Sequence, residues 1–511
     1  MGGGDVTETT NEPEPGGWDL MQAGAEAMGR GDLGAALRIF EDAARTATGD
    51  VRVAAMVNAA VVTDHSGDHA GAAKRFREAL GQMPSHAPRM RPGALIGLSQ
   101  ALQHLGDLDA AQDALEQARG LLAAEDAPVD LRFACGVSAT AIALHRSQWA
   151  RAIELASESL DAATLFAPEQ AGHPLMNLAA AHFETGRWDL AEDFAGQALA
   201  AFEAAGDIDG VAETRQNLAL MHTRSGRFDE AEAPLTASQD YFESAGLAYR
   251  AGIGWKVMGF IAEHRVDLET AAARYRQALE RFEQSGAEID AADVRTRLAT
   301  VAFTGGDHPT GEAELAAARQ TYAERGLGLH CAQLDFWHAG LLEPLLDSLP
   351  ALLPQAVDLA VPAALAFDAV RHELPDGAQR ENWNRRMADP ALRLAFRYAH
   401  LAGDARLIAD LIETICAGET LDLDRLSIAP SGLPFDTLDL PTPPVTNQAP
   451  VPEALQLGTA SAAVAASAGL PITLPPRIAV APDNHIALAD WITAAEQRYG
   501  RPLRENRVIP A

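Results

Sequence analysis

Small and large apolar residues follow short turn signals in a fixed order along most of the chain. The signals stand 36 to 41 residues apart and are Gly31-Asp32, Gly67-Asp68, Gly106-Asp107, Ser147-Gln148, Gly186-Arg187, Gly226-Arg227, Val266-Asp267 and Gly306-Asp307. Five residues after each signal comes a small residue: Ala36, Ala72, Ala111, Ala152, Ala191, Ala231, Ala271 and Gly311. Four residues later the residue is often larger, and three residues further it is Ala or Ser, so these positions share one helical face. Another apolar-periodic stretch precedes each turn, and each unit is therefore predicted to be helix, short turn, helix.

A single helical hairpin leaves an apolar face uncovered, and stacking of neighbouring hairpins buries these faces in one core. The small-large-small order with a Gly-Asp turn resembles the tetratricopeptide repeat family over Trp18 to Tyr322. The spacing exceeds that family's usual period of about 34 residues, so the resemblance is to its longer-period bacterial members. It implies an all-α fold, a right-handed superhelical solenoid of about eight hairpins. Repeats 4, 7 and 8 are the least regular, because Ser147, Val266 and Gly311 replace the expected residues.

Composition and periodicity divide the chain into five expected segments. They are a disordered tail at residues 1–16, the solenoid at 17–325, a helical capping region at 326–420, an irregular Pro-, Ala- and Ser-rich linker at 421–480, and an amphipathic helix with its tail at 481–511. Within the capping region we expect helices over 345–371, 378–387, 390–401 and 404–415. A single amphipathic helix is marginal by itself in water. The helix expected from Ile486 to Tyr499 therefore docks either on its own solenoid or on a partner.

The charge and the cysteine content exclude several kinds of partner and site. Lys and Arg number 40 against 71 Asp and Glu, and the net charge of −31 opposes both phosphate backbones and anionic lipid headgroups. We therefore expect no nucleic acid and no membrane partner. Cys135, Cys331 and Cys416 are too few and too scattered for a disulfide framework or a cysteine-based metal site. The sequence shows neither a secretory leader nor an apolar run of membrane-spanning length, which favours a cytoplasmic protein.

The sequence contains no motif that would support catalysis. A phosphate-binding loop, a zinc-protease helix, a nucleophile elbow and a strand-linked dinucleotide fingerprint are all missing from it. We therefore expect a protein that is not an enzyme and uses no metal or cofactor. The repeats also resemble the front halves of bacterial proteins that end in a caspase-like protease domain. Such a domain needs a cysteine and a histidine on a sizeable core. No cysteine follows Cys416, and His485 is the one histidine after it, so we expect no such protease domain in this sequence.

One further cluster of possible metal ligands lies around Cys331, which has His330 and His338 nearby in the sequence. Cysteine and histidine are both zinc ligands. A helix packed against the last repeat accounts for the same residues, because free cysteine behaves as a small apolar residue. We favour the packed helix.

Positions on the first helix of each repeat are the best candidates for a binding site, because in the resembled family this helix normally lines the concave groove. Nine residues before the turn signal stand Asn58, Asn177 and Asn217. Asparagine both donates and accepts, so it can hold the backbone of an extended peptide. In the resembled family an asparagine at this place often does so. Hydrogen bonding between helices or to solvent is the alternative.

Basic residues form a second candidate set on the first helices of repeats 6 to 8. They are Arg215, Arg224, Lys256 and Arg297, with Arg295 beside them. Because a guanidinium group binds carboxylates in a fork-like geometry, these residues are candidates to receive an acidic segment. Salt bridges within the stack are the alternative.

Histidines form a third set two residues before the turns. His65, His104 and His145 occupy this position, and His264 is close to it. One histidine per repeat could form a pH-sensitive ladder that repels itself once it is charged. Ordinary surface placement is the alternative.

These observations lead to two hypotheses on function. The first is a non-catalytic scaffold or adaptor that binds an extended segment of a partner protein in the concave groove. The alternative is a regulatory sensor subunit that controls a separate effector, such as a protease or a transcription factor, in a bacterial signalling or defence system.

Overall fold

The computed structural model describes most of the helical part of the chain. The described residues are 17–30, 32–83, 90–105, 107–123, 128–146, 148–370, 374, 377–418, 438, 455–456, 472–473 and 487–503. The predicted tail at 1–16 and nearly all of the predicted linker at 421–480 lie outside them.

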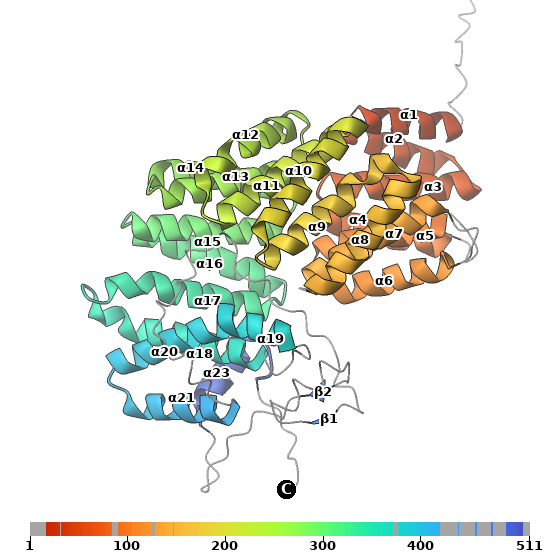
Figure 1. Ribbon diagram of the computed structural model, residues 1–511. Helices are drawn as coiled ribbons and strands as arrows, with labels where there is room; N and C mark the ends of the chain where they lie inside the picture. Colours follow the sequence, from red (N-terminus) through yellow and green to blue (C-terminus); the bar gives the residue numbers. More distant parts are fainter. Residues whose placement is uncertain are drawn as a thin grey trace, which may run out of the picture. The chain divides into compact units, whose positions relative to one another are not determined.

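Up to residue 324, the described chain alternates between the first and second helices of successive hairpins (Figure 1). The first helices are α1 (Gly17–Gly29), α3 (Gly49–His65), α5 (Met90–His104), α7 (Val129–His145), α9 (Gly172–Glu184), α11 (Ile208–Arg224), α13 (Ala248–His264) and α15 (Glu288–Thr304). The second helices are α2 (Leu33–Thr46), α4 (His69–Gln82), α6 (Leu108–Leu121), α8 (Trp149–Phe166), α10 (Trp188–Ala205), α12 (Phe228–Ser244), α14 (Leu268–Ser285) and α16 (His308–Glu324). A short 3₁₀ turn, η1 (Pro168–Gln170), precedes α9. The prediction of an all-α solenoid of helical hairpins is confirmed.

The small residues after each turn are buried in every one of the eight repeats. Ala36, Ala72, Ala111, Ala152, Ala191, Ala231 and Ala271 have 0% exposure, and Gly311 is buried as well. The larger residues four positions later, such as Phe40, Phe76 and Tyr275, are also buried. The small side chain lets two helices approach while the larger one fills the space beside it, as close packing requires.

The turn signals owe their composition to two local requirements. The aspartate caps the second helix: Asp68, for example, accepts a hydrogen bond from the backbone N–H of Gly71 at 2.8 Å. The glycine before it adopts a positive φ, 92° at Gly67 and 83° at Gly306, which glycine tolerates best. Val266 stands at the same place with a φ of 61°.

The contacts divide the chain into two units. The first comprises Met1–Leu218 with Thr236–Ala251, and the second comprises Ala219–Leu235 with Gly252–Ala511. In the first unit, the largest core runs from Val53 to Ile142 and is built on α3 to α7. In the second unit, the largest core gathers buried residues of α15, α16 and the helices that follow them.

The helical pattern continues beyond the eight repeats. The elements are α17 (Gly328–Leu342), η2 (Glu343–Leu345), η3 (Pro350–Leu352), α18 (Leu353–Val370), α19 (Gly377–Trp383), a π-helical turn η4 (Asn384–Ala388), α20 (Asp389–Leu401), α21 (Ala405–Gly418) and α23 (Ala489–Tyr499). Two-residue strands β1 (Leu455–Gln456) and β2 (Ile472–Thr473) pair in parallel. The single helix predicted over 345–371 is wrong at its start, because Pro350 opens a separate 3₁₀ turn and α18 begins at Leu353.

One of these helices is apolar enough to cross a membrane by length and composition. It spans Pro350–Val370, so the expectation that no such run exists was wrong. Most of its residues from Ala356 to Val370 are buried, and it packs against α17, α20 and α23. Its apolar character is that of a helix in the core of the second unit.

The C-terminal helix α23 docks on its own chain. Ile492, Ala495 and Tyr499 enter the core of the second unit, and α23 contacts α17 and α18. Of the two alternatives that the sequence left open, docking on the same chain and docking on a partner, the structure shows the first.

Candidate functional site

The three candidate asparagines are half-buried on first helices of the first unit. Asn58 lies on α3, Asn177 on α9 and Asn217 on α11. None of the three amides forms a side-chain hydrogen bond within the described part of the chain. Each amide therefore keeps its donors and its acceptor for solvent or for a ligand.

The position nine residues before the turn is filled differently in other repeats. Gly97 leaves space that the ring of Phe76 occupies, since a Cβ at Gly97 would lie 2.4 Å from that ring. Ser138 accepts a hydrogen bond from Gln103 at 2.9 Å. In these two repeats the position is used internally.

In the second unit the same position holds Val257 on α13 and Arg297 on α15. Arg297 has 1% exposure and is the largest fully buried side chain in the described chain. Its guanidinium carbon lies 4.9 Å from the ring centre of Phe260 and 4.6 Å from that of Trp337. Both distances are within the range of cation–π attraction. Residues of α13, α15 and α17 thus bring two aromatic rings and one positive charge together.

Polar groups also lie around Arg297. Nη1 lies 3.7 Å from one carboxylate oxygen of Glu263, and the other oxygen of that carboxylate accepts a hydrogen bond from the hydroxyl of Tyr275 at 2.6 Å. The indole N–H of Trp337 donates to Thr300 Oγ1 at 2.8 Å, which fixes the orientation of the indole. Burial raises the pKa of Tyr275 well above its ordinary value.

A residue distant in the sequence binds this arginine. Arg297 Nη2 donates a hydrogen bond to the backbone carbonyl of Leu438 at 2.9 Å. Leu438 itself is 3% exposed. Its apolar neighbours in the cluster are Ala219, Ala231, Leu235, Val257, Phe260 and Ile261. We call Arg297 together with this cluster the Arg297 pocket; it accepts one aliphatic side chain and one backbone carbonyl.

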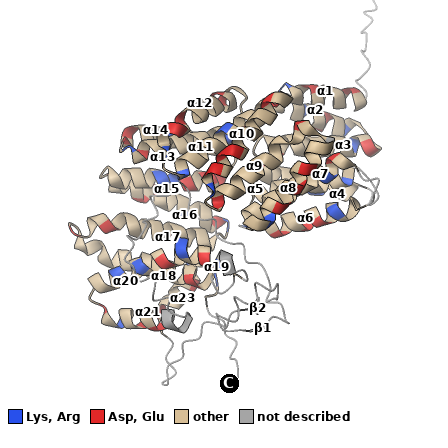
Figure 2. Ribbon diagram, in the orientation of Figure 1, with Lys and Arg blue, Asp and Glu red and all other residues tan. Residues whose placement is uncertain are grey.

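The other predicted cations take part in ion pairs or other contacts of their own chain. Lys256 Nζ lies 2.5 Å from Asp293, and Arg215 lies 3.5 Å from Glu203. Arg295 pairs with Glu283 at 2.7 Å and with Glu314 at 2.9 Å. Arg224 is exposed and also has a contact. Figure 2 shows acidic and basic residues interspersed along the helices, which is the setting in which such pairs form.

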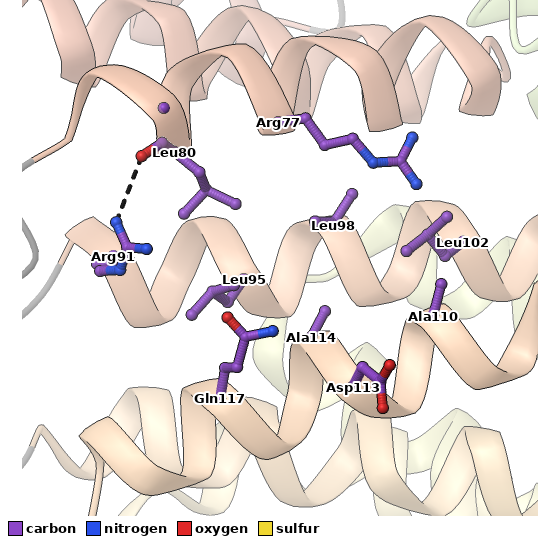
Figure 3. Close-up of a pocket in the computed structure, with 11 residues that line it drawn as sticks. Arg77, Leu80, Arg91, Leu95, Leu98, Leu102, Ala110, Asp113, Ala114 and Gln117 are labelled. Atoms are coloured by element: carbon purple, nitrogen blue, oxygen red, sulfur yellow. Dashed lines mark hydrogen bonds between the residues drawn. The ribbon is translucent and has the colours of Figure 1, made fainter.

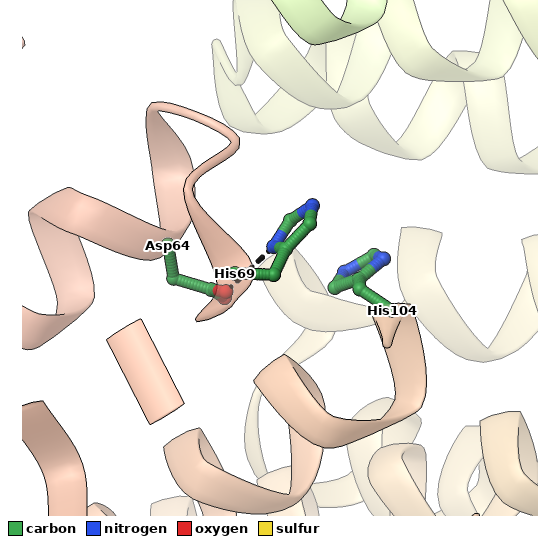
Figure 4. Close-up of side chains that lie close together, drawn as sticks. All are labelled: Asp64, His69 and His104. Carbon is green, nitrogen blue, oxygen red and sulfur yellow. Dashed lines mark hydrogen bonds and ion pairs between the residues drawn. The ribbon is translucent and has the colours of Figure 1, made fainter. Parts of the chain in front are cut away.

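His65, His104 and His145 are all exposed residues at the ends of their helices. His104 stacks on His69, a residue that the sequence argument did not single out, with ring centres 4.1 Å apart and planes at 16° (Figure 4). His69 Nδ1 is 2.8 Å from a carboxylate oxygen of Asp64. The loss of solvation among the packed helices, followed by the nearby His69, lowers the pKa of His104 to about 3. Loss of solvation also lowers the pKa of His145.

Asp64, His69 and His104 are ligand types that a metal ion could use, since their ligand atoms lie within 4.8 Å of one another. An ion bound by imidazole lies near the plane of the ring, at about 2.0 to 2.1 Å from nitrogen for zinc. Nearly parallel stacked rings cannot both direct their nitrogens at one such ion. The observed arrangement is therefore that of a stacked, hydrogen-bonded histidine pair rather than a formed metal centre.

A shallow cavity of about 380 Å³ lies in the first unit between α4, α5 and α6 (Figure 3). Leu95, Leu98 and Leu102 contribute apolar surface, while Arg77 and Asp113 add opposite charges. Arg91 donates to the carbonyl of Leu80 at 3.3 Å. The second helices α4 and α6 contribute much of its lining, and none of the predicted site residues belongs to it.

The helix around Cys331 is packed as predicted. In α17, Cys331 and His338 are both buried, and His338 Nε2 lies 3.0 Å from Glu312. Loss of solvation raises the pKa of the Cys331 thiol and lowers that of His330 to about 4.

The sequence singled out Arg297 as a candidate but did not single out the residues that surround it. Phe260, Trp337 and Glu263 lie one repeat away on either side, and a signal for them existed in the 40-residue spacing of the turns. Leu438 had no such signal, because it stands 141 residues from Arg297 outside the repeats.

Comparison with known proteins identifies the repeat type. Residues 170–244 match the family model described as tetratricopeptide repeat. No curated protein matches the chain.

Several solved structures are similar at low identity. A Rap protein complexed with competence and sporulation factor is 14% identical, with a TM-score of 0.44, over 68% of this chain and 98% of that one. Aspartyl phosphate phosphatase F from Bacillus subtilis is 11% identical, with a TM-score of 0.40, over 63% and 96% of the two chains. A signal transduction ATPase with a tetratricopeptide repeat sensor from Pyrococcus horikoshii is 17% identical, with a TM-score of 0.39, over 61% and 50%.

Proposed function

From the tetratricopeptide repeats at residues 170–244, we propose that this chain is a protein-interaction module that binds extended segments of a partner protein on its first helices. Stacked helical repeats present extended surfaces of this kind for binding. Under this proposal the chain acts as a scaffold or adaptor and carries out no catalysis itself.

The observation that carries the proposal is the contact between Arg297 and Leu438. Arg297, nine residues before its turn on a first helix, binds the backbone carbonyl, and residues of α11, α12 and α13 enclose the aliphatic side chain. Asn58, Asn177 and Asn217 occupy that same position in the first unit, with amides unused within the described chain. Recognition of a carbonyl and of one aliphatic side chain is what binding of an extended segment requires.

The proposed roles follow from the chemistry of each side chain. Asn58, Asn177 and Asn217 hold backbone groups of the partner, because an amide can donate and accept at once. Arg297 binds a backbone carbonyl. For Arg215, Arg224 and Lys256 we propose a role in favouring acidic residues in the bound segment over basic ones.

The test begins with a partner captured by the full chain and identified by mass spectrometry, followed by calorimetric titration. Asn177→Ala and Asn217→Ala should each weaken binding about 5- to 150-fold, because a polar group left unpaired in the interface costs about 1 to 3 kcal/mol. The control is Gln197→Ala, which removes an exposed amide from the second helix α10. It should leave the affinity unchanged.

Equal melting temperatures for all three variants would show that the effect is on binding. If both asparagine variants bind as tightly as the wild type, the partner does not use the first helices of the first unit, and the proposed role of these residues is wrong.

A further inference from the structure

We infer that Leu438 is an internal ligand of the Arg297 pocket, which holds the pocket closed to partners until a competing segment displaces it. This inference rests on the proposed function, because it names the regulation of the same binding surface.

Leu438 does not belong to the repeats that form the pocket. It follows the end of α21 at Gly418 by 20 residues, and the pocket is built by residues of α11 to α15 with Trp337 of α17. A residue supplied from outside the repeat array satisfies the pocket in the way that a partner residue would.

The buried guanidinium group of Arg297 needs hydrogen-bond acceptors. Its side chain is 1% exposed and carries N–H donors but no acceptor of its own. Nη2 donates to the carbonyl of Leu438, and Glu263 lies on the Nη1 side. Without Leu438, this donor loses a buried acceptor and the apolar residues around Val257 and Phe260 lose a neighbour.

The sequence around Leu438 indicates the chemistry of a competing segment. Leu438 lies in the sequence Phe435-Asp-Thr-Leu-Asp-Leu440, in which acids stand two residues before and one residue after it. A partner segment of the same sequence type carries an aliphatic residue, leucine above all, flanked by acidic residues. Such a segment supplies the backbone carbonyl and the aliphatic side chain that Leu438 supplies.

Tethering explains how one leucine can control access. A ligand that belongs to the same chain as its binding site reaches an effective concentration of the order of millimolar, which a free competitor must overcome. If the internal segment by itself binds the empty pocket with a dissociation constant of about 10 to 100 μM, a competitor binds the wild-type protein about 10- to 100-fold more weakly than it binds a protein whose pocket is empty.

The experiment uses the full chain and the variant Leu438→Asp, which places a carboxylate where the pocket takes an aliphatic group. The probe is a fluorescent synthetic peptide of residues 432–444, and its binding is measured by fluorescence anisotropy. We expect the peptide to bind Leu438→Asp at least tenfold more tightly than it binds the wild type. A peptide carrying the same Leu438→Asp change should bind neither protein.

Hydrogen exchange supplies an independent readout of occupancy. Amides of α13 and α15 near the pocket should exchange faster in Leu438→Asp than in the wild type, and added peptide should restore their protection. The matched control is Leu457→Asp, the same change at another leucine of the Pro- and Ala-rich stretch. It should behave as the wild type does in both measurements.

The outcomes separate the inference from the proposed function. Identical exchange and identical peptide affinity in wild type and Leu438→Asp would overturn the internal ligand. Faster exchange in Leu438→Asp, combined with no binding of either the peptide or the captured partner, would leave Leu438 as a purely structural contact. That result would contradict both the competition and the proposed binding role of the pocket.

Discussion

The hydroxyl of Tyr499 donates a hydrogen bond to a carboxylate oxygen of Asp335 at 2.9 Å, across 164 residues of sequence. Arg498 Nε approaches the same oxygen at 2.8 Å, and Arg319 pairs with the other oxygen. This buried group of charges fastens the C-terminal helix α23 to α17. Burial raises the pKa of Asp335 despite the two guanidinium groups, and it raises the pKa of Tyr499 well above its ordinary value.

Removal of this hydroxyl should loosen the helix. Tyr499→Phe leaves the ring in the core and deletes one donor to a buried carboxylate, so we expect a loss of about 1 to 3 kcal/mol in the free energy of unfolding. The control is Tyr241→Phe, whose hydroxyl donates to the solvent-accessible Asp209. It should cost less. Chemical denaturation of both variants measures the difference, and equal losses would contradict the role given to burial.

A second prediction concerns Gly328, at the start of α17. A Cβ at this position would lie 2.0 Å from the carbonyl oxygen of Tyr499, a backbone atom that cannot turn aside. Gly328→Ala should therefore displace α23 and speed hydrogen exchange over residues 489–499. The matched change Gly196→Ala has open space around it and should stabilise α10 by about 0.5 to 1 kcal/mol. Unchanged protection of α23 in Gly328→Ala would contradict the docking.

A third prediction concerns Val266, which stands where most of the turn signals have glycine. Val266 has a φ of 61° and is 75% exposed, so it carries backbone strain with little packing to offset it. A side chain costs about 1 to 2 kcal/mol in this conformation, and glycine removes that cost. Glycine also raises the conformational entropy of the unfolded chain, which lowers the free energy of unfolding by about 0.4 to 1 kcal/mol. Val266→Gly should raise the free energy of unfolding by about 0.5 to 1 kcal/mol. Gly226→Val, the reverse change one repeat earlier, should lower it, and a loss of stability in Val266→Gly would refute this reading of the turn.

A fourth prediction concerns stability at acidic pH. The pKa of His104 is about 3 in the folded protein against an ordinary value of 6.5, so the unfolded chain binds the proton more tightly. Stability is therefore fully present above about pH 6.5 and falls as the pH decreases from there towards 3. His104→Gln removes this proton site and should reduce the loss of melting temperature between pH 6.5 and 4. If the variant and the wild type lose stability in parallel, His104 is not held neutral by the fold.

The features of the fold that could be predicted from the sequence are those that depend on short-range patterns along the chain. Ala191 and its equivalents are buried as expected, because helical offsets of four and three are a short-range property of the chain. Asp68 caps its helix for an equally local reason. The start of α18 was missed because Pro350 and the preceding turn interrupt an apolar stretch that reads as continuous.

The candidate site could be predicted only in part, because its contacts are tertiary. Arg297 was expected to face the carboxylate of a partner, yet the structure places it between Phe260 and Trp337 and binds it to a carbonyl. The stacking of His69 on His104 joins two repeats and depends on how adjacent hairpins pack. The insertion of Leu438 has no counterpart in any periodic pattern, since nothing local to that residue indicates its acceptor site.

The central claim is that the Arg297 pocket is a protein-binding site whose internal occupant is Leu438. Its most direct test is the ratio of two dissociation constants for the captured partner, one measured by calorimetry on the wild type and one on Leu438→Asp, with Leu457→Asp as the control. The account predicts that Leu438→Asp binds the partner about 10- to 100-fold more tightly. Equal dissociation constants for the two proteins would contradict it.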